Sequence, residues 1–333
     1  MTNTQSPHTT TRIVCGMDAG GTQISVLSSA DGEIVTLPPD FGSMPEAIRW
    51  VVEHFGLPEL LYIGGAGALD AQGNIEMTNR PAWPVFNPEE FGEEIGCKIV
   101  VVNDMIIKAA ALELDDVEID LLRDGTEDPE GTKTIITVSS GVNNAQLFPD
   151  RTTSSAEGGH TTWQPISELE DAVLQALREL HGSRLFSVEE LIGGKSLLKL
   201  YDALNKCGYS LKNELHRQCI EQCRRTGTGI GPFITQLALA GEPFCVRFMG
   251  VFASVLGQYM RNTALFTLPT AGIYVTGGVM QPDVARYVFA QQQLMAAFLG
   301  GNKHNELLSQ IPIYLVLDQN MGVKGALRLA LRS

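Results

Sequence analysis

The stretch Cys15-Gly16-Met17-Asp18-Ala19-Gly20-Gly21-Thr22 decides the fold, because short apolar runs flank its glycines on both sides. These runs are Ile13 to Met17 and Ile24 to Leu27, and they predict a strand, a tight glycine turn and a second strand. Paired glycines lack a Cβ, so backbone N–H groups can come close to a ligand. An acid and a hydroxyl beside such a turn suit a phosphate that carries a divalent cation. An ordinary hairpin turn beside an acid would give the same pattern.

Composition narrows the class of protein. The chain has 333 residues, which suits two domains, and its 44% hydrophobic and 19% charged content is typical of a globular protein. The formal net charge of −14 predicts a surface that repels nucleic acid and anionic membranes, so neither is an expected partner. ATP stays compatible with this charge, because backbone N–H groups can build a phosphate site locally.

A polar segment at the N-terminus and the most apolar segment of the chain predict a tail and a buried helix. Residues 1–11 are polar and lack the apolar core of a signal peptide, so we expect a disordered tail, a cytoplasmic location and reduced cysteines. The most apolar stretch, Phe244 to Leu268, carries Arg247 and Arg261. We therefore expect a buried helix there and no membrane span.

Strands and helical stretches alternate in the first hundred residues. We expect a helix over Met44 to Phe55 and a strand over Leu60 to Ile63. Lys98 to Val102 is apolar enough to predict a strand that is covered on both faces, and it ends at Asn103-Asp104. The acidic stretch Glu113 to Glu130 is expected to be a surface excursion.

The opening pattern restarts at Thr134. Ile135 to Val138 predicts a strand, Ser139 to Asn144 a polar turn, and Ala145 to Phe148 a second strand. Two such units can bind one ligand from opposite sides of a cleft. Capping-box residues then start two helices, at Ser167 with Glu170 and at Ser187 with Glu190, and the rest of the chain is mainly helical.

Polar or glycine-rich turns follow the predicted strands, which is where ligands collect in open α/β sheets. These turns are Asp18 to Thr22, Asn103-Asp104, Ser139-Ser140-Gly141, Glu157-Gly158-Gly159-His160 and Gly277-Gly278-Val279. Each turn alone is a weak signal, whereas their order and spacing together are specific.

In these motifs the sequence resembles the bacterial glucokinases of the actin-like, hexokinase-type ATPase superfamily, from about Arg12 to the C-terminus. The matching motifs are Asp18 to Thr22 (first phosphate motif), Met77-Thr78-Asn79 with Trp83 (the approach to the sugar region), Asn103-Asp104 (catalytic pair), Glu157 to His160 (sugar motif), Thr276 to Val279 (adenosine motif) and Gly322 to Ala326 (terminal glycine turn).

The resemblance implies an α/β fold of the two-lobed actin-like ATPase (ribonuclease H-like) type, with mixed central sheets flanked by helices. It implies a small domain over residues 12–109 and 318–333, a large domain over 110–317, and a cleft between them. A homodimer through the larger lobe is also expected.

The same resemblance implies transfer of the ATP γ-phosphoryl group to the 6-hydroxyl of glucose. Asp104 is the expected general base, and capping the next helix is its ordinary alternative role. The expected sugar ligands are Asn79, Asn103, Asp104, Glu157, His160 and Glu189, with Glu190 as the neighbouring alternative to Glu189. Asp18 is expected to hold Mg²⁺, and the expected ATP-binding residues are Asp18, Gly20, Gly21, Thr22, Ser140, Gly141, Gly277 and Gly278.

One motif departs from the family. Its second phosphate loop is roughly Gly-x-Gly-Thr-Gly-x-Gly, whereas Thr137 to Asn143 keeps only Gly141 and offers Ser140 as a hydroxyl. If side chains crowd the phosphates here, the protein is a working kinase with altered nucleotide handling or sugar preference. The open alternatives are a kinase for another hexose or amino sugar and a non-catalytic sugar-binding or regulatory relative. A DNA-binding role is not expected, because the tail before Arg12 has no basic cluster.

Overall fold

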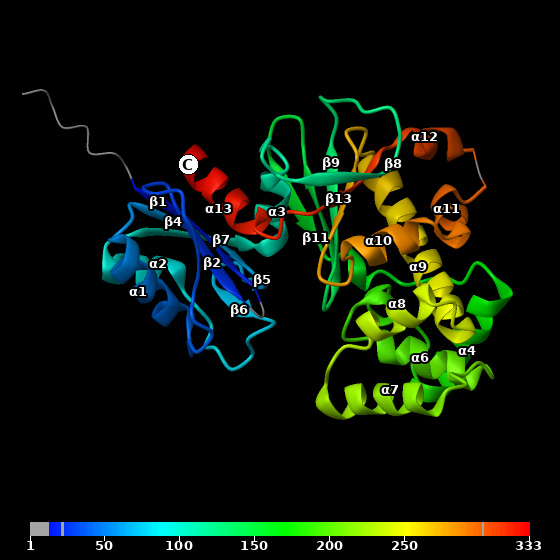
Figure 1. The fold of residues 1–333 in the computed structure, drawn as a ribbon. Coiled ribbons are helices and arrows are strands. Elements are labelled where there is room, and N and C mark those ends of the chain that lie inside the picture. Colours follow the sequence, from blue (N-terminus) through cyan, green and yellow to red (C-terminus); the bar gives the residue numbers. More distant parts are fainter. Residues whose placement is uncertain (1–12, 21–22, 302) are drawn as a thin grey trace, which may run out of the picture. The chain divides into compact units, whose positions relative to one another are not determined.

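Two sheets, each with its own helices, organise the chain (Figure 1). The computed structural model describes residues 13–20, 23–301 and 303–333. It divides into two compact units: the first runs to Asp115 and takes in Gln319–Ser333, and the second is Asp116–Asp318. The mixed α/β class predicted from the sequence is confirmed.

The first unit is built on a five-stranded mixed sheet of order β3-β2-β1-β4-β7. Its strands are β1 (Val14–Ala19), β2 (Ile24–Ser28), β3 (Ile34–Thr36), β4 (Leu60–Gly65) and β7 (Lys98–Asn103). β1 is antiparallel to β2 and parallel to β4, so the predicted strand–turn–strand unit is confirmed. Ala19 is opposite Gly65, and Gly65 is opposite Asn103, which brings the ends of β1, β4 and β7 to one edge.

The helices of this unit are α1 (Met44–Phe55), α2 (Pro88–Ile95), α3 (Asp104–Ala111) and α13 (Met321–Arg332), and β5 (Gly67–Leu69) pairs with β6 (Ile75–Met77). Two glycines let α13 pack closely on its neighbours. A Cβ at Gly16 of β1 would lie 2.1 Å from the backbone N of Leu327, and one at Gly325 would lie 1.8 Å from the carbonyl O of Ile107 in α3. The C-terminal helix is therefore fixed against both β1 and α3.

The prediction that the Lys98–Val102 strand is covered on both faces was wrong. Of these residues only Val101 is buried. β7 is the edge strand of the sheet and pairs with β4 alone, so it receives less cover than a central strand.

The second unit contains a six-stranded mixed sheet of order β11-β10-β9-β12-β13-β8. Its strands are β8 (Ile119–Arg123), β9 (Lys133–Val138), β10 (Val142–Leu147), β11 (Thr153–Ala156), β12 (Ile273–Thr276) and β13 (Ile313–Val316). β9 is antiparallel to β10 and parallel to β12, which repeats the arrangement of β1 with β2 and β4. The restart predicted at Thr134 is confirmed, but the turn is shorter than the predicted Ser139 to Asn144, because β10 already begins at Val142.

The acidic stretch Glu113–Glu130 is more than a surface excursion, because it contains β8. This strand pairs antiparallel with β13 at the edge of the sheet. The Arg123 side chain also donates hydrogen bonds to the carbonyl oxygens of Leu308, at 3.3 Å, and Ile311, at 2.9 Å. These partners are distant in sequence, so local composition gave no signal of the strand.

The helices of the second unit surround one long buried helix, α9 (Pro243–Thr267), as predicted. The others are the 3-10 turn η1 (Gly158–His160), α4 (Glu168–His181), α5 (Glu189–Ile192), α6 (Leu197–Lys206), α7 (Glu214–Thr226), α8 (Gly231–Leu239), α10 (Pro282–Phe289), α11 (Gln292–Leu299) and α12 (Asn305–Gln310). Among the described residues no single helix meets the criteria for a membrane span, whereas the pair α8–α9, bent by 115°, meets them by length and composition only when taken together.

Candidate active site

In the first unit, the predicted residues gather where β1 and β7 end. Asn103 closes β7, and its Oδ1 accepts a 2.9 Å hydrogen bond from the Met105 N–H at the start of α3. Its Nδ2 donates to the Gly67 carbonyl at 3.3 Å. Asn103 is thus the N-cap of α3, so the capping role considered for Asp104 was wrong and the Asp104 carboxylate is left for other contacts.

Asp104 forms a close ion pair with Lys108, one turn further along α3. The Lys108 Nζ lies 2.6 Å from Asp104 Oδ2, and the side chains are only 19% and 21% exposed. Within the described residues, the other oxygen, Oδ1, accepts no hydrogen bond. One oxygen of this carboxylate is therefore anchored, and the other is available to a ligand.

Asp18, at the end of β1, is the second acid of this group. Burial raises the pKa of Asp18 to about 6, the positive charge of Lys108 lowers it, and the negative charge of Asp104 raises it. Burial opposes the charge of Lys108, but the anions Asp104 and Asp18 outweigh that effect and raise the pKa of Lys108. The three side chains therefore form one electrostatic group of two acids and a cation.

Gly322, in the first turn of α13, gives Asp18 its space. A Cβ at Gly322 would lie 2.0 Å from Asp18 Oδ2. The terminal glycine turn thus has a direct structural reason, because any larger residue would displace the acid.

The glycine turn after β1 is only partly described. The Gly20 carbonyl accepts a 3.3 Å hydrogen bond from the Arg80 Nε–H. Gly21 and Thr22 lie outside the described residues. Asn79 lies half-buried in the turn after β6, one residue before Arg80.

In the second unit, the Glu157–His160 turn lies directly on β10. A Cβ at Gly159 would lie 1.9 Å from the Val142 carbonyl O, and one at Gly158 would lie 2.2 Å from Asn144 Oδ1. The two glycines are therefore required by this close approach. The side chains of Glu157 and His160 on either side of them are exposed.

Neutral N–H donors hold both candidate sugar-binding acids of the second unit. The Asn143 Nδ2 donates a 3.0 Å hydrogen bond to Glu157 Oε2. The Val142 N–H donates one of 2.8 Å to Glu189 Oε2, and a Cβ at Gly141 would lie 2.3 Å from that oxygen. Asn143 and Gly141 come from the departing loop, so this loop orders the acids beside it.

Glu190 differs clearly from its neighbour Glu189. Its Oε2 accepts a 3.0 Å hydrogen bond from the Ser187 N–H, while the Glu190 N–H donates to Ser187 Oγ at 3.3 Å, which confirms the predicted capping box. Its Oε1 lies 2.8 Å from Lys199 Nζ. Both oxygens of Glu190 therefore have partners away from the second turn.

The second turn is tied to the Gly277-Gly278 turn by a serine hydroxyl. The Gly278 N–H donates a 3.1 Å hydrogen bond to Ser139 Oγ. Gly277 has a φ of 114°, and a Cβ there would lie 2.3 Å from the Val138 carbonyl O. Ser140 is exposed, and its carbonyl accepts a 3.3 Å hydrogen bond from the Lys195 N–H. Sequence reasoning missed both the Ser139 and the Asn143 contacts.

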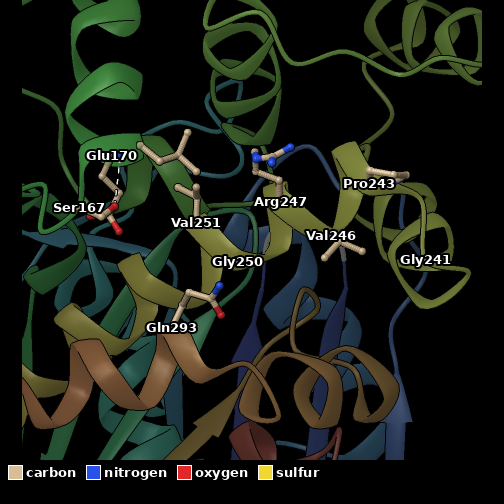
Figure 2. A pocket seen from close by; sticks show the side chains of 10 residues that line it. Ser167, Glu170, Gly241, Pro243, Val246, Arg247, Gly250, Val251 and Gln293 are labelled. Atoms are coloured by element: carbon tan, nitrogen blue, oxygen red, sulfur yellow. Dashed lines mark hydrogen bonds between the residues drawn. The ribbon is translucent and has the colours of Figure 1, made fainter.

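A cavity of about 640 Å³ lies elsewhere in the second unit (Figure 2). It is lined by residues from the start of α4, from α9 and the loop before it, and from α11, among them Glu170, Arg247 and Gln293. Glu170 Oε2 already accepts hydrogen bonds from the Ile166 N–H and Gln258 Nε2, and Arg247 stacks on Tyr209 at 4.0 Å. None of the residues predicted for the site lines this cavity.

Comparison with known proteins places the chain among sugar kinases. A family model described as Glucokinase matches residues 17–333. The glucokinase of Chromohalobacter salexigens is 27% identical over 322 residues, covering 93% of this chain and 94% of that protein. A glucokinase of Neisseria meningitidis is 25% identical over 295 residues, covering 86% and 84%.

Solved structures share the fold. The glucokinase from an Antarctic psychrotroph superposes with a TM-score of 0.77 at 23% identity, covering 97% of this chain and 99% of that one. A ROK family glucokinase from Streptomyces griseus, solved with glucose and AMPPNP, gives a TM-score of 0.61 at 18% identity and covers 96% and 100%. The actin-like ATPase fold expected from the sequence is thereby confirmed.

Proposed function

The chain belongs to the glucokinase family, and we propose that it is an ATP-dependent kinase that phosphorylates the 6-hydroxyl of glucose. The observation that carries this proposal is the state of Asp104. It begins α3 at the end of β7, Asn103 performs the capping in its place, and its Oδ1 accepts no hydrogen bond within the described residues. A carboxylate left free in this way can accept the proton of a substrate hydroxyl.

Asp104 acts as the general base of the proposed reaction. The 6-oxygen of the sugar forms a bond to the γ-phosphorus, the bond from that phosphorus to the β–γ bridging oxygen breaks, and the hydroxyl proton passes to Asp104 Oδ1. The products are sugar 6-phosphate and ADP. Positioning and charge stabilisation dominate the rate of such a transfer, so the groups that hold Asp104 matter as much as its basicity.

Glu157, His160 and Glu189 supply partners for the sugar hydroxyls, together with Asn79 and Asn103. Each glutamate has one oxygen fixed by an N–H donor from residues 142–143. A polyol needs several fixed donors and acceptors, and a buried mismatch costs about 1–3 kcal/mol per group. The prearranged acids therefore support selection of one sugar among its isomers.

Asp18 suits a magnesium ion that arrives with ATP. Mg²⁺ in kinases keeps several waters and binds one or two carboxylates together with substrate phosphates. In the described part of the chain no group of three or more His, Cys, Asp or Glu side chains is arranged as a metal site, so a site completed by phosphate is the arrangement that fits. When bound, the ion neutralises phosphate charge.

The remaining ATP-binding residues come from three turns. Gly20, with Gly21 and Thr22 outside the described residues, belongs to the first turn. Ser140 and Gly141 belong to the second turn, and Gly277 and Gly278 follow β12. These turns follow strand ends, where backbone N–H groups are available to phosphate.

An ADP-release assay over a panel of sugars tests the function. We expect turnover with glucose to exceed that with mannose, fructose, N-acetylglucosamine and N-acetylmannosamine in kcat/KM. Asp104→Asn should lower kcat about a thousandfold, because loss of a positioned base removes a factor of about 10²–10⁴. A preference for another sugar would identify a different hexose or amino-sugar kinase. No turnover with any sugar would favour a non-catalytic sugar-binding relative.

We also propose that the enzyme is a homodimer, an assembly that its family resemblance suggests. Light scattering coupled to size-exclusion chromatography measures this directly. A mass near 72 kDa, about twice the 36.1 kDa of the chain, is expected, and a monomer mass at micromolar protein would contradict it.

A further inference from the structure

Lys108 stands out because it is a nearly buried cation whose partner is the proposed base. It follows Asp104 by four residues on α3, and its Nζ lies 2.6 Å from Asp104 Oδ2. Exposed Asp–Lys pairs at this spacing are common and stabilise a helix by only about 0.3–0.5 kcal/mol. Here both side chains are about four-fifths covered, at 19% and 21% exposure, so the ammonium is held in place beside the carboxylate.

Lys108 also offsets the charge of a second acid. Its positive charge lowers the pKa of Asp18, whereas the negative charge of Asp104 raises it. Removing the ammonium would leave Asp104 Oδ2 without its ion-pair partner. A largely covered carboxylate that loses its partner is costly, so the Asp104 side chain would change its position.

Resting on the proposed function, we propose that Lys108 is a positioning residue for the base. Its ammonium holds Oδ2 of Asp104, which directs Oδ1 toward the hydroxyl that is to be phosphorylated. Lys108 touches neither sugar nor ATP in this role and acts only through Asp104.

The inference predicts an effect on turnover rather than on sugar binding. Lys108→Met keeps an unbranched side chain as far as Cε and removes the ammonium group. A misplaced catalytic group commonly loses a factor of about 10–100, so kcat with glucose should fall by that amount. KM for glucose should change by less than about threefold, because the ammonium contacts the base and not the sugar.

Four variants and one control separate this role from a structural one. The variants are Lys108→Met, Lys108→Arg, Asp104→Asn and the double variant Lys108→Met with Asp104→Asn. The control is Lys206→Met, which breaks the exposed 3.3 Å pair of Lys206 with Glu179 on α6 and α4 and should leave turnover unchanged. Circular dichroism and thermal melting establish that each variant folds.

The arginine variant and the double variant give two further expected results for a positioning role of Lys108. Lys108→Arg keeps the charge and should have a kcat at least about fivefold above that of Lys108→Met. In the Asp104→Asn background, Lys108→Met should change the residual turnover less than about twofold, because the group that it positions is already gone.

Two results overturn the inference while the enzyme remains a kinase. One is a kcat of Lys108→Met within about twofold of wild type, and the other is an equal loss with and without the Asp104 carboxylate. Failure of the wild-type protein to release ADP with any sugar would instead overturn the proposed function, and with it the role of Lys108. The wild-type assay thus distinguishes the two failures.

Discussion

In the first unit Asp104 is held by the ammonium of Lys108, whereas in the second unit Glu157 and Glu189 are held by neutral N–H donors. The difference follows from burial. Asp104 shares its strand edge with Asp18, so two nearby carboxylates need a cation. Glu157 is exposed to solvent, and a single hydrogen bond is enough to orient it.

The same contrast appears in the two strand–turn–strand units. An acid near the end of β1 is followed by two glycines, whereas β9 is followed by Ser139 and Ser140 and β10 then begins with two asparagines after Val142. These side chains make hydrogen bonds: Ser139 Oγ accepts one from the Gly278 N–H, and Asn143 Nδ2 donates one to Glu157. Where the family pattern has glycines with an accessible backbone, the segment after β9 therefore has side chains that make specific contacts.

The largest expected effect comes from breaking the contact between β10 and the Glu157–His160 turn. Gly159→Ala would place a Cβ 1.9 Å from the Val142 carbonyl O, so the backbone must shift. We expect the free energy of unfolding to fall by about 3 kcal/mol, measured by urea titration. Gly229→Ala is the matched control, since its Cβ would have no neighbour closer than 4.0 Å. Equal stability of the two variants would show that the turn yields easily.

A comparable effect is expected from the buried acid of the first unit. The pKa of Asp18 is about 6 in the folded protein against 3.8 in the unfolded chain, so ionisation is disfavoured by folding. Stability is therefore lost as pH rises from about 4 to 6, and Asp18→Asn should be more stable than wild type by about 3 kcal/mol above pH 7. Urea unfolding in EDTA measures this. A difference that does not shrink toward about pH 4 would contradict the assignment.

The strands and turns that depend on local sequence were largely predictable, whereas the pairing of strands that are far apart in the sequence was not. The turns at Asp18 and Ser139 carried local signals, namely apolar runs on both sides of small polar residues. β8 and the edge position of β7 depend on strands far away in sequence, which no local pattern reports.

The sequence contains local patterns that could have predicted two of the site contacts. The spacing of Asp104 and Lys108 is that of a helical ion pair and was legible in the sequence, as was an asparagine directly before Asp104. The bond from Asn143 to Glu157 joins residues that are 14 positions apart, one in β10 and one directly after β11, and the pairing of β10 with β11 brings them together.

A sharper test of the neutral donors is Asn143→Gly, which restores the residue that the family pattern has there. Loss of the 3.0 Å hydrogen bond frees the Glu157 carboxylate. We expect KM for glucose to rise about fivefold, equivalent to about 1 kcal/mol, with KM for ATP unchanged. Steady-state kinetics with each substrate varied in turn measures both constants. A change in KM for ATP alone would favour the crowding of phosphates by Asn143 instead.

The smallest effect is expected from Ser139→Gly, which frees the Gly278 N–H from its 3.1 Å hydrogen bond. A free N–H can serve the nucleotide, so KM for ATP should fall about threefold while KM for glucose stays constant. Ser139→Ala is the companion variant, because it removes the hydroxyl but keeps a side chain. If neither variant alters KM for ATP, this turn does not govern nucleotide affinity.

The return of α13 to the first unit sets an order of events during synthesis. Residues 116–318 form a continuous unit, so the ribosome completes them before it adds the helix that packs on Gly16 and Gly325. Until then β1 lacks its cover and Asp18 lacks the glycine beside it. The first strands of the growing chain therefore stay incompletely packed while the second unit can already fold. In a protease experiment on nascent chains, we expect the N-terminal segment to become resistant to cleavage only after the second unit has done so.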